Sequence, residues 1–501
     1  MTPFVLGGFM KAGRVRAYLS AAAKIALGTL LLQPPAMAED QSFAQWAAAH
    51  AIPIPARDDN GDSPDLLALK SLIGTARVVA LGEPIHGAHE PMAFRNRLFR
   101  FLVEQMGFTA IALESGFTEA GKVDLFVAGG PGNAQDVARA GLTSGFERFI
   151  ENRDLIQWMR DYNVTAAATG RRKLHFYGID MSAGAGRISG PRRALDDALV
   201  FLSRADPMTA GSIRSWLDNG LPGVADDEVA ALPAATLATL DRGITAIGNA
   251  MKSNRDGLIA RSSPEAYRRA LHELAVARQI ENYLGLMGRM GPGSGLSDAG
   301  PLMGTRDHAM AENVRWAVEN EGPGGRLLVF AHDAHVLNWK LAGGIFDAVR
   351  EPPVMMGSYL RSVYGKDLVI IATSSAWASA QLPAPEPVED SIDSVLARIG
   401  LPALMLDLST APENKAAQAW LSKPQALHAN LSSHIMITPA TAVDAFYFVD
   451  RLTPARGAPL AGRLLNEFEN HRETMLAFFG VAVLSAVAWG VHQRRQRMVR
   501  M

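Results

Sequence analysis

The sequence predicts an α/β fold in which a mostly parallel sheet carries helices on both of its faces. Apolar runs such as Val78 to Leu81 and Ala110 to Leu113 are short, are bounded by turns, and alternate with stretches of helical periodicity. Runs this short and this uniformly apolar are typical of strands buried in a parallel sheet. Because these strands alternate with helices along the chain, we expect helices to cover both faces of the sheet.

The predicted elements follow one another along the chain. Residues 39–75 are polar and helical in pattern, with breaks at Pro53 and Pro55. A helix is predicted from Pro91 to Gly107, with proline near its start and glycine at its end, and another from Thr305 to Asn320. The strand candidates, in chain order, are Val78–Leu81, Ala110–Leu113, Lys173–Ile179, Arg326–Ala331, Val354–Leu360, Leu368–Thr373, Ile435–Thr438 and Ala445–Val449.

The segment 191–300 departs from this alternation. Residues 191–290 carry long helical patterns rich in Ala, Leu and Arg, with few strand signals, and a glycine-rich stretch follows from Met287 to Gly304. We interpret the segment as a helical insertion, or lid, that covers the edge of the sheet. It would belong to one catalytic domain that spans residues 39–465.

The N-terminus has the pattern of a secretory signal peptide. Basic residues precede the apolar run from Ile25 to Leu32, and the small residues Ala36-Met37-Ala38 follow it. A basic region, an apolar core and an A-x-A site predict cleavage after Ala38, so that residues 1–38 would be removed. The alternatives are an uncleaved anchor and a misplaced start codon.

The C-terminus has the pattern of a membrane anchor. The run from Met475 to Val491 carries no charge, and a basic tail, residues 492–501, follows it. Such a run is just long enough to span a thin bilayer, and arginines after it favour the cytoplasmic side. We therefore expect an exported protein in the periplasm or cell envelope, held at the inner membrane by this helix. The alternative is a terminal helix buried in the folded domain.

Composition excludes several classes of function. The net charge of -1 is unlike that of a general nucleic-acid binder, which carries a basic excess. The chain has no cysteine, which removes disulfides, thiolate nucleophiles and Cys-ligated zinc.

Ionisable residues gather where four of the predicted strands end. Because the carboxyl ends of parallel strands share one edge of the sheet, these residues are expected to converge there. Histidine titrates near neutral pH and can act as a general base, while a neighbouring carboxylate orients its ring. The strand-end residues are Glu83 and His86, then Glu114, then Asp180, then His332 and His335.

Three further residues lie close to this set. Arg95, on the first helix, could clamp a carboxylate or stabilise developing negative charge, and its alternative is a surface salt bridge. Glu90 is a candidate substrate contact, with a favourable interaction at the helix N-terminus as the alternative. Asp333, between the two histidines, is a third candidate.

Other catalytic motifs are weak or absent in the sequence. Only Gly141-Leu-Thr-Ser-Gly145 has the outline of a nucleophile elbow, with Thr143 at its centre. No phosphate-binding loop and no H-E-x-x-H pair occurs. The spacing of His332 and His335 also permits a metal-binding pair, but it is not diagnostic, and we expect no metal.

Five blocks of the chain together resemble the erythromycin esterase family. Gly82-Glu83-Pro84-Ile85-His86-Gly87 is similar to the G-E-x-x-H-G signature of that family. The further blocks, in the family order, are Ile111–Glu114, Gly178–Asp180, Arg306–Asn313 and Ala331–Val336. The resemblance covers roughly residues 70–450 and implies a three-layer α/β/α fold with a helical lid. It also implies hydrolysis of an ester without a metal, as characterised members hydrolyse the lactone ester of macrolide antibiotics.

The resemblance also implies roles for the strand-end residues. His86 would be the general base that activates water, and Glu83 would orient and polarise it. Arg95, Glu114, His332 and His335 would complete the catalytic set, and Glu90, Asp180 and Asp333 would contact substrate. The chain departs from the family in Pro84-Ile85, where Ala-Thr is frequent, and in Asp333, where Asn is frequent.

The sequence therefore predicts a metal-independent hydrolase of esterase type that needs no cofactor. Its partners would be a small ester or lactone and water, and a macrolide is one candidate substrate. One alternative is a haem- or iron-binding envelope protein, in which His86, His332 or His335 would be ligands. Another is an enzyme of envelope polysaccharide or acyl metabolism.

Overall fold

The structure is a computed structural model of the chain. It describes residues 35–55, 64–181, 183–184, 187–188, 192–221, 232–290, 294–379, 382, 388–409, 415–429 and 433–457.

A mixed sheet of eight described strands lies at the centre of the molecule, in the order β1-β9-β12-β8-β2-β7-β3-β4. The run from β12 to β4 is parallel throughout, while β9 pairs antiparallel with both β12 and β1. The predicted mostly parallel α/β sheet is thus confirmed. The strands are β1 (Ile52–Pro53), β2 (Val78–Glu83), β3 (Ala110–Gly116), β4 (His175–Asp180), β7 (Leu327–His332), β8 (Leu368–Ala378), β9 (Ala403–Asp407) and β12 (Ala445–Leu452).

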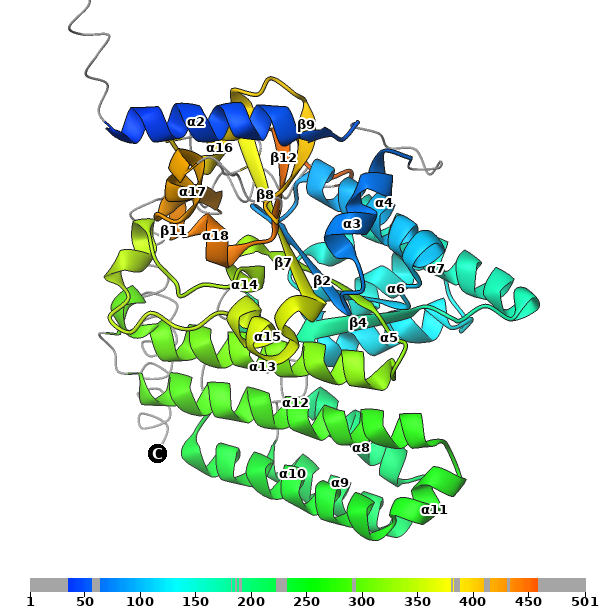
Figure 1. Cartoon of the computed structure of the whole chain (residues 1–501). Helices are drawn as coiled ribbons and strands as arrows, with labels where there is room; N and C mark the ends of the chain where they lie inside the picture. The colour runs from blue at the N-terminus through cyan, green and yellow to red at the C-terminus, as the bar shows by residue number, and fades with distance from the viewer. Residues whose placement is uncertain are drawn as a thin grey trace, which may run out of the picture.

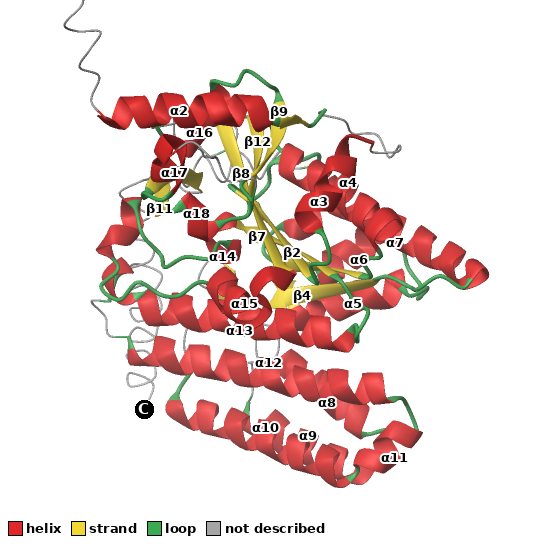
Figure 2. Cartoon of the chain, in the orientation of Figure 1, coloured by secondary structure: helices red, strands yellow, loops and turns green. Residues whose placement is uncertain are grey.

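Helices cover both faces of this sheet, and the side chains of each strand divide between two hydrophobic cores. Along β2, Val78 and Ala80 belong to one core while Val79 and Leu81 belong to the other, as strand alternation requires. Figure 2 shows the strands in yellow between the two helical layers in red. One layer contains α2 (Pro35–His50), α13 (Gly300–Asn320), α14 (Asp333–Val336), α15 (Met356–Tyr364), α16 (Ile392–Ala397), α17 (Lys415–Leu421) and α18 (Pro439–Ala442). The other contains α3 (Leu69–Ile73), α4 (His89–Met106), α5 (Phe117–Val127), α6 (Ala134–Gly141) and α7 (Ile150–Thr169).

The segment predicted as an insertion forms a layer of helices beyond α13, at the bottom of Figure 1. Its helices are α8 (Arg192–Leu202), α9 (Pro207–Gly220), α10 (Ala234–Ser253), α11 (Arg255–Ala260) and α12 (Pro264–Arg289). They enclose a hydrophobic core of their own, and a smaller cluster with Phe117 and Met181 joins α12 to the body. Whether this layer acts as a lid stays a prediction.

Two predicted strands differ from the structure. Val354 to Leu360 was expected to be a strand, but Met356–Tyr364 is helix α15, because a short apolar run fits a buried helix as well as a strand. Ile435 to Thr438 overlaps β11 (Ser433–Ile437), which pairs with β10 (Gln425–Ala429) in a separate hairpin outside the main sheet. A second small pair is β5 (Ala183–Gly184) with β6 (Arg187–Ile188).

The predicted terminal segments lie almost wholly outside the described residues. Of the expected signal peptide, residues 1–38, only the last four are described, and they begin α2. The expected membrane helix, 475–491, and the basic tail after it are not among the described residues. None of the helices in the described ranges is long and apolar enough to cross a membrane. The predicted export and anchoring therefore stay predictions.

Close packing of α15 on the last residue of α14 is open to a direct test. A Cβ added at Gly357 would lie 1.9 Å from the carbonyl oxygen of Val336. We expect Gly357→Ala to lower the free energy of unfolding by about 1–3 kcal/mol, because the backbone must move apart. Gly211, an exposed position of α9 with no atom within 4 Å of such a Cβ, is the matched control. Gly211→Ala should raise stability by about 0.5–1 kcal/mol in the same urea titration. Equal stability of the two variants would contradict the packing described.

Candidate active site

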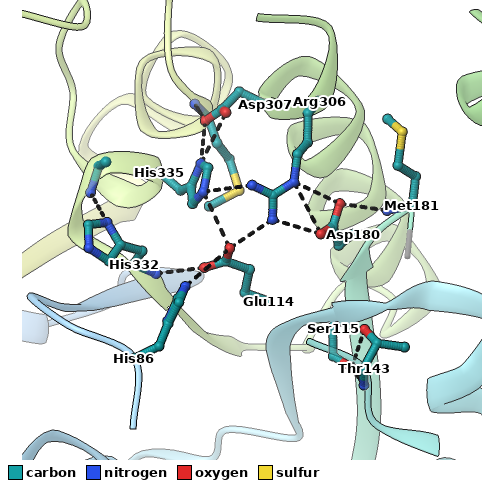
Figure 3. Close-up of polar contacts among 12 residues, drawn as sticks. His86, Glu114, Ser115, Thr143, Asp180, Met181, Arg306, Asp307, His332 and His335 are labelled. Carbon is teal, nitrogen blue, oxygen red and sulfur yellow. Dashed lines mark hydrogen bonds and ion pairs between the residues drawn. The ribbon is translucent and has the colours of Figure 1, made fainter. Parts of the chain in front are cut away.

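The predicted strand-end residues converge on one edge of the sheet. Strands β2, β7, β3 and β4 are neighbours and run parallel, so their carboxyl ends meet there. Figure 3 shows Glu114 at the centre of this cluster, with side chains from the loop after β2, from β4 and β7, and from helices α13 and α14 around it. The structure thus brings the predicted strand-end residues together at one edge of the sheet.

Glu83 and His86 form a hydrogen-bonded pair at the end of β2. The Nδ1 of His86 lies 2.7 Å from Oε1 of Glu83, whose side chain is fully buried. The His86 side chain keeps 33% of its surface exposed, and its Nε2 lies 3.8 Å from Oε1 of Glu114, beyond hydrogen-bonding distance. Nε2 therefore makes no hydrogen bond to the described residues and faces a partly open environment.

The charges around His86 favour its protonated form. Burial lowers the pKa of the ring, but the carboxylates of Glu114 and Glu83 raise it, and the net result is a raised pKa. Burial also raises the pKa of the Glu83 carboxyl, which makes it a stronger acceptor for the Nδ1 proton of His86. This hydrogen bond fixes the tautomer of neutral His86 with its lone pair on Nε2.

Glu114, at the end of β3, connects the other groups. Its Oε2 accepts the backbone N–H of His332 at 2.8 Å, and its Oε1 accepts from Nη2 of Arg306 at 2.8 Å. The same Oε1 lies 3.3 Å from Nε2 of His335. Burial would raise the pKa of Glu114, but His335, His86 and Arg306 hold it well below its ordinary value. Glu114 is therefore a buried carboxylate that stays charged.

His335 is held as an imidazolium. Its Nδ1 lies 2.9 and 3.0 Å from the two carboxylate oxygens of Asp307, and Glu114 lies on its other side. Burial lowers its pKa, but Asp307 and Glu114 raise it to about 10. A ring that is charged at neutral pH cannot accept a proton from water, so His335 does not fit the role of a general base.

His332 is held neutral by contrast. Its Nε2 donates to the carbonyl oxygen of Pro84 at 3.0 Å, and its Nδ1 accepts the backbone N–H of Ala334 at 3.1 Å. Burial and the charge of His86 lower its pKa to about 3. Both ring nitrogens of His332 are thus in backbone hydrogen bonds, and the bond to Pro84 fixes the loop that carries His86.

Arg306 and Asp307 of α13 complete the cluster, and no role was predicted from the sequence for either of them. Arg306 contacts both oxygens of Asp180, with Nη2 at 2.7 Å from Oδ2, and its Nη1 lies 3.2 Å from Nε2 of His335. Both residues lie in the block Arg306–Asn313, which resembles the family. That resemblance is the feature of the sequence that could have pointed to them. Nothing in that block predicted that α13 would pack across the carboxyl edge of the sheet.

Arg95 lies deeper than expected for a group that contacts substrate. Its side chain is fully buried, and it donates from Nε and Nη2 to Oδ1 of Asn96 at 3.1 and 2.8 Å. Its guanidinium carbon lies 4.7 Å from the centre of the Phe330 ring. The expected contact with developing charge on the substrate therefore does not fit its fully buried position.

The three expected substrate contacts are also engaged within the protein. Glu90 accepts from the backbone N–H and the hydroxyl of Thr453, at 2.7 and 2.6 Å, and so fastens the end of β12 to α4. Asp180 is fully buried in its ion pair with Arg306.

Asp333 is buried on the opposite side of β2 from Glu83. Its Oδ1 accepts the backbone N–H of Thr373 at 3.1 Å, and burial raises its pKa well above the ordinary value. A Cβ at Gly82 would lie 1.8 Å from that Oδ1, which explains glycine at this position. Asp333 thus joins α14 to the sheet.

The geometry gives less support to two other candidate chemistries, a nucleophile elbow and the binding of a metal or haem. Thr143, centre of the possible nucleophile elbow, follows helix α6, and its Oγ1 accepts the backbone N–H of Gly116 at 2.9 Å. As iron or haem ligands, His332 and His335 would have to give up the hydrogen bonds described above. Within the described part of the chain, no group of three or more His, Asp or Glu residues is arranged to hold a metal ion.

The chain is similar to known proteins over most of its length. The family model described as erythromycin esterase matches residues 103–453. Erythromycin esterase type II of Escherichia coli is 26% identical over 341 residues, which cover 66% of this chain and 77% of that protein. A putative hydrolase of Bacillus subtilis (strain 168) is 23% identical over 444 residues, which cover 84% of this chain and 93% of the relative.

Solved structures share the fold. A Bacillus cereus protein superposes with a TM-score of 0.69 at 22% identity, over 83% of this chain and 98% of its own. A succinoglycan biosynthesis protein gives a TM-score of 0.61 at 19% identity, over 83% and 98% of the two chains. An erythromycin esterase mutant in its open conformation superposes with a TM-score of 0.57 at 18% identity, over 81% of this chain and 98% of its own. At these identities the likeness establishes the architecture alone.

The charged state of His335 can be measured directly. We expect its imidazole to stay protonated at pH 8 in a nuclear magnetic resonance titration, because Asp307 and Glu114 flank it. Asp307→Asn keeps an oxygen for the backbone N–H of Met356 but removes the charge, so the pKa of His335 should fall. His332, with a pKa of about 3, is the internal control and should stay neutral from pH 5 to pH 9. Titration of His335 near 6.5 in the unaltered protein would contradict this assignment.

Proposed function

Because the chain belongs to the erythromycin esterase family, we propose that it hydrolyses a small ester or lactone with water activated by His86. The family membership supports hydrolysis in general. The particular base, and the ester or lactone class of the substrate, are proposed from the arrangement of side chains at the sheet edge.

One observation supports His86 as the general base. Of the three histidines, only His86 has a ring nitrogen outside hydrogen-bonding distance of the described residues, and its side chain is the most exposed of those in the cluster. Its other nitrogen is held by Glu83. This is the arrangement that a general base requires, with one nitrogen oriented by a carboxylate and the other open to water.

In the proposed reaction, neutral His86 takes a proton from water at Nε2 while the water oxygen attacks the ester carbonyl carbon. The carbonyl oxygen gains negative charge as the tetrahedral intermediate forms. The imidazolium of His86 then returns the proton to the departing alkoxide, and the acid and alcohol are released. Glu83 stabilises the imidazolium between these two steps.

Positive groups near the open nitrogen would stabilise the oxyanion. His335 and Arg306 keep 12% and 22% of their side-chain surface exposed and carry positive charge close to Glu114. Charged groups held in place before the reaction lower the energy of an oxyanion without reorganising. We assign this role to His335 and Arg306 rather than to the fully buried Arg95.

The substrate is proposed only as a class. The name of the Escherichia coli relative makes a macrolide lactone the first compound to test, alongside simpler esters. At the loop beside the base, Pro84 and Ile85 offer no side-chain hydroxyl, and the carbonyl of Pro84 is occupied by His332. Both residues are buried, and Ile85 packs in a hydrophobic core, so neither side chain is open to a substrate.

Removal of the base gives the first test. We expect His86→Ala to lower kcat for ester hydrolysis by about 10²–10⁴-fold while the protein stays folded, since general-base catalysis contributes that much. Glu83→Gln should lower kcat by a smaller factor, because the ring remains but loses its charged partner. The measurement is steady-state hydrolysis of a panel of esters and lactones, with circular dichroism to monitor folding.

An exposed histidine outside the cluster supplies the control. His308 lies on α13 and contacts the ring of Tyr359, so His308→Ala should keep normal turnover. The unaltered protein should also keep its rate after exhaustive chelation if the reaction uses no metal. Near-normal hydrolysis by purified His86→Ala, or loss of activity on chelation, would refute the mechanism.

The pH dependence gives a second test. A general base must be neutral, so kcat/KM should fall as pH drops through the pKa of His86. Since Glu114 and Glu83 raise that pKa, the acidic limb should lie above the ordinary histidine value of about 6.5. A profile that stays flat down to the range of free carboxylates, about pH 4, would mean that a carboxylate rather than His86 accepts the proton.

A further inference from the structure

The buried guanidinium of Arg95 interacts electrostatically with two carboxylates, those of Glu83 and Glu151. Arg95 is fully buried, and its Nη1 has no hydrogen-bond partner among the described residues. Burial lowers the pKa of Arg95 to about 10, although the negative charges of Glu83 and Glu151 raise it. Glu151 lies on α7. Glu151 has no part in the proposed reaction, yet it acts on the same cation as Glu83.

Glu151 is itself fully buried and holds two segments next to the site. Its Oε1 lies 2.6 Å from Nδ1 of His89, which stands three residues after His86 at the start of α4. The backbone carbonyl oxygen of Glu151 accepts a hydrogen bond from Nδ2 of Asn96 at 2.8 Å. Oδ1 of Asn96 in turn accepts hydrogen bonds from Nε and Nη2 of Arg95. Glu151 therefore fixes the end of the loop that carries His86 and, through Asn96, the position of Arg95.

Both carboxylates keep one oxygen out of the hydrogen-bond network. Oε2 of Glu83 and Oε2 of Glu151 are buried and, within the described ranges, have no hydrogen-bond partner. Arg95 must then be balanced by attraction through space, which is strong where water is excluded. If Glu151 loses its charge, its pull on Arg95 is lost, and the buried guanidinium is drawn toward Glu83 alone.

We propose that Glu151 is a positioning residue of this site, which shares Arg95 with Glu83 and so keeps the Glu83 carboxylate available to the His86 ring. The proposal rests on the proposed function of the Glu83–His86 pair as a catalytic base. Without the charge of Glu151, Arg95 would pair more fully with Glu83. The Glu83 carboxylate would then stabilise the His86 imidazolium less, and His86 would be a weaker base.

The test compares Glu151→Gln with Asp154→Asn. Asp154 lies one turn along α7, is 49% exposed, and accepts Nη2 of Arg456 at 2.7 Å. Glu151 binds the same arginine, whose backbone N–H and Nε lie 3.0 and 3.1 Å from its Oε1. Both variants thus weaken the contact with Arg456, but only Glu151→Gln changes the charge beside His89 and Arg95.

Two measurements are made on each full-length variant. The first is the pH profile of kcat/KM for ester hydrolysis, and the second is a nuclear magnetic resonance titration of the His86 ring, assigned by comparison with His86→Ala. For Glu151→Gln we expect the His86 titration and the acidic limb to move to lower pH by about half a unit. The plateau rate should fall about tenfold, as for other groups that orient a catalytic residue from behind. Asp154→Asn should match the unaltered protein in both.

A second variant keeps the test open if Glu151→Gln does not fold. Asn96→Ala leaves the Glu151 side chain in place and removes only the amide that holds Arg95, so it should move the His86 titration in the same direction. The proposal is overturned if the His86 titration is unmoved in the folded variants, if activity falls with no change of the acidic limb, or if Asp154→Asn has the same effect. If the titration moves but the unaltered protein hydrolyses no ester, the coupling stands and the proposed function fails.

Discussion

The arrangement of the site depends on one buried carboxylate, Glu114. It stands at the end of β3 without access to bulk water, and ionising it there would be costly without partners. The backbone N–H of His332, the guanidinium of Arg306 and the ring of His335 provide those partners from three other elements. Because Glu114 must stay paired, β7, α13 and α14 are held in fixed positions around the end of β3.

Three histidines of one cluster reach three different states because their neighbours differ. His335 lies against two carboxylates and stays charged, while His332 has both nitrogens in backbone hydrogen bonds and stays neutral. His86 lies between these limits, with one nitrogen on Glu83 and one open. The same residue type thus supplies a fixed positive charge in His335, a structural link in His332 and a candidate base in His86. The different surroundings of the three rings give them these separate roles.

Several charged residues outside the Glu83–His86 pair hold the surrounding segments in place. Arg95 is fully buried against Asn96, and Asp333 fastens α14 on the other side of β2. Glu90 and Glu151 hold the loop and helix that follow His86 against the C-terminal end of the described chain. Buried polar groups of this kind are costly unless they are paired, so their presence indicates that the geometry of the Glu83–His86 pair is tightly specified.

The sequence by itself determined the fold class, the strands that carry Glu83, Glu114, Asp180 and His332, and the edge where they meet. It could do so because short apolar runs and strand-end residues are local patterns, and parallel strands bring equal ends together. It failed at Val354–Leu360, where periodicity does not separate helix from strand. Only the tertiary structure decided that Arg306 and Asp307 reach the site and that Arg95 and Asp333 do not face it. Those outcomes depend on how helices pack across the sheet, and hence on contacts between residues far apart in the chain.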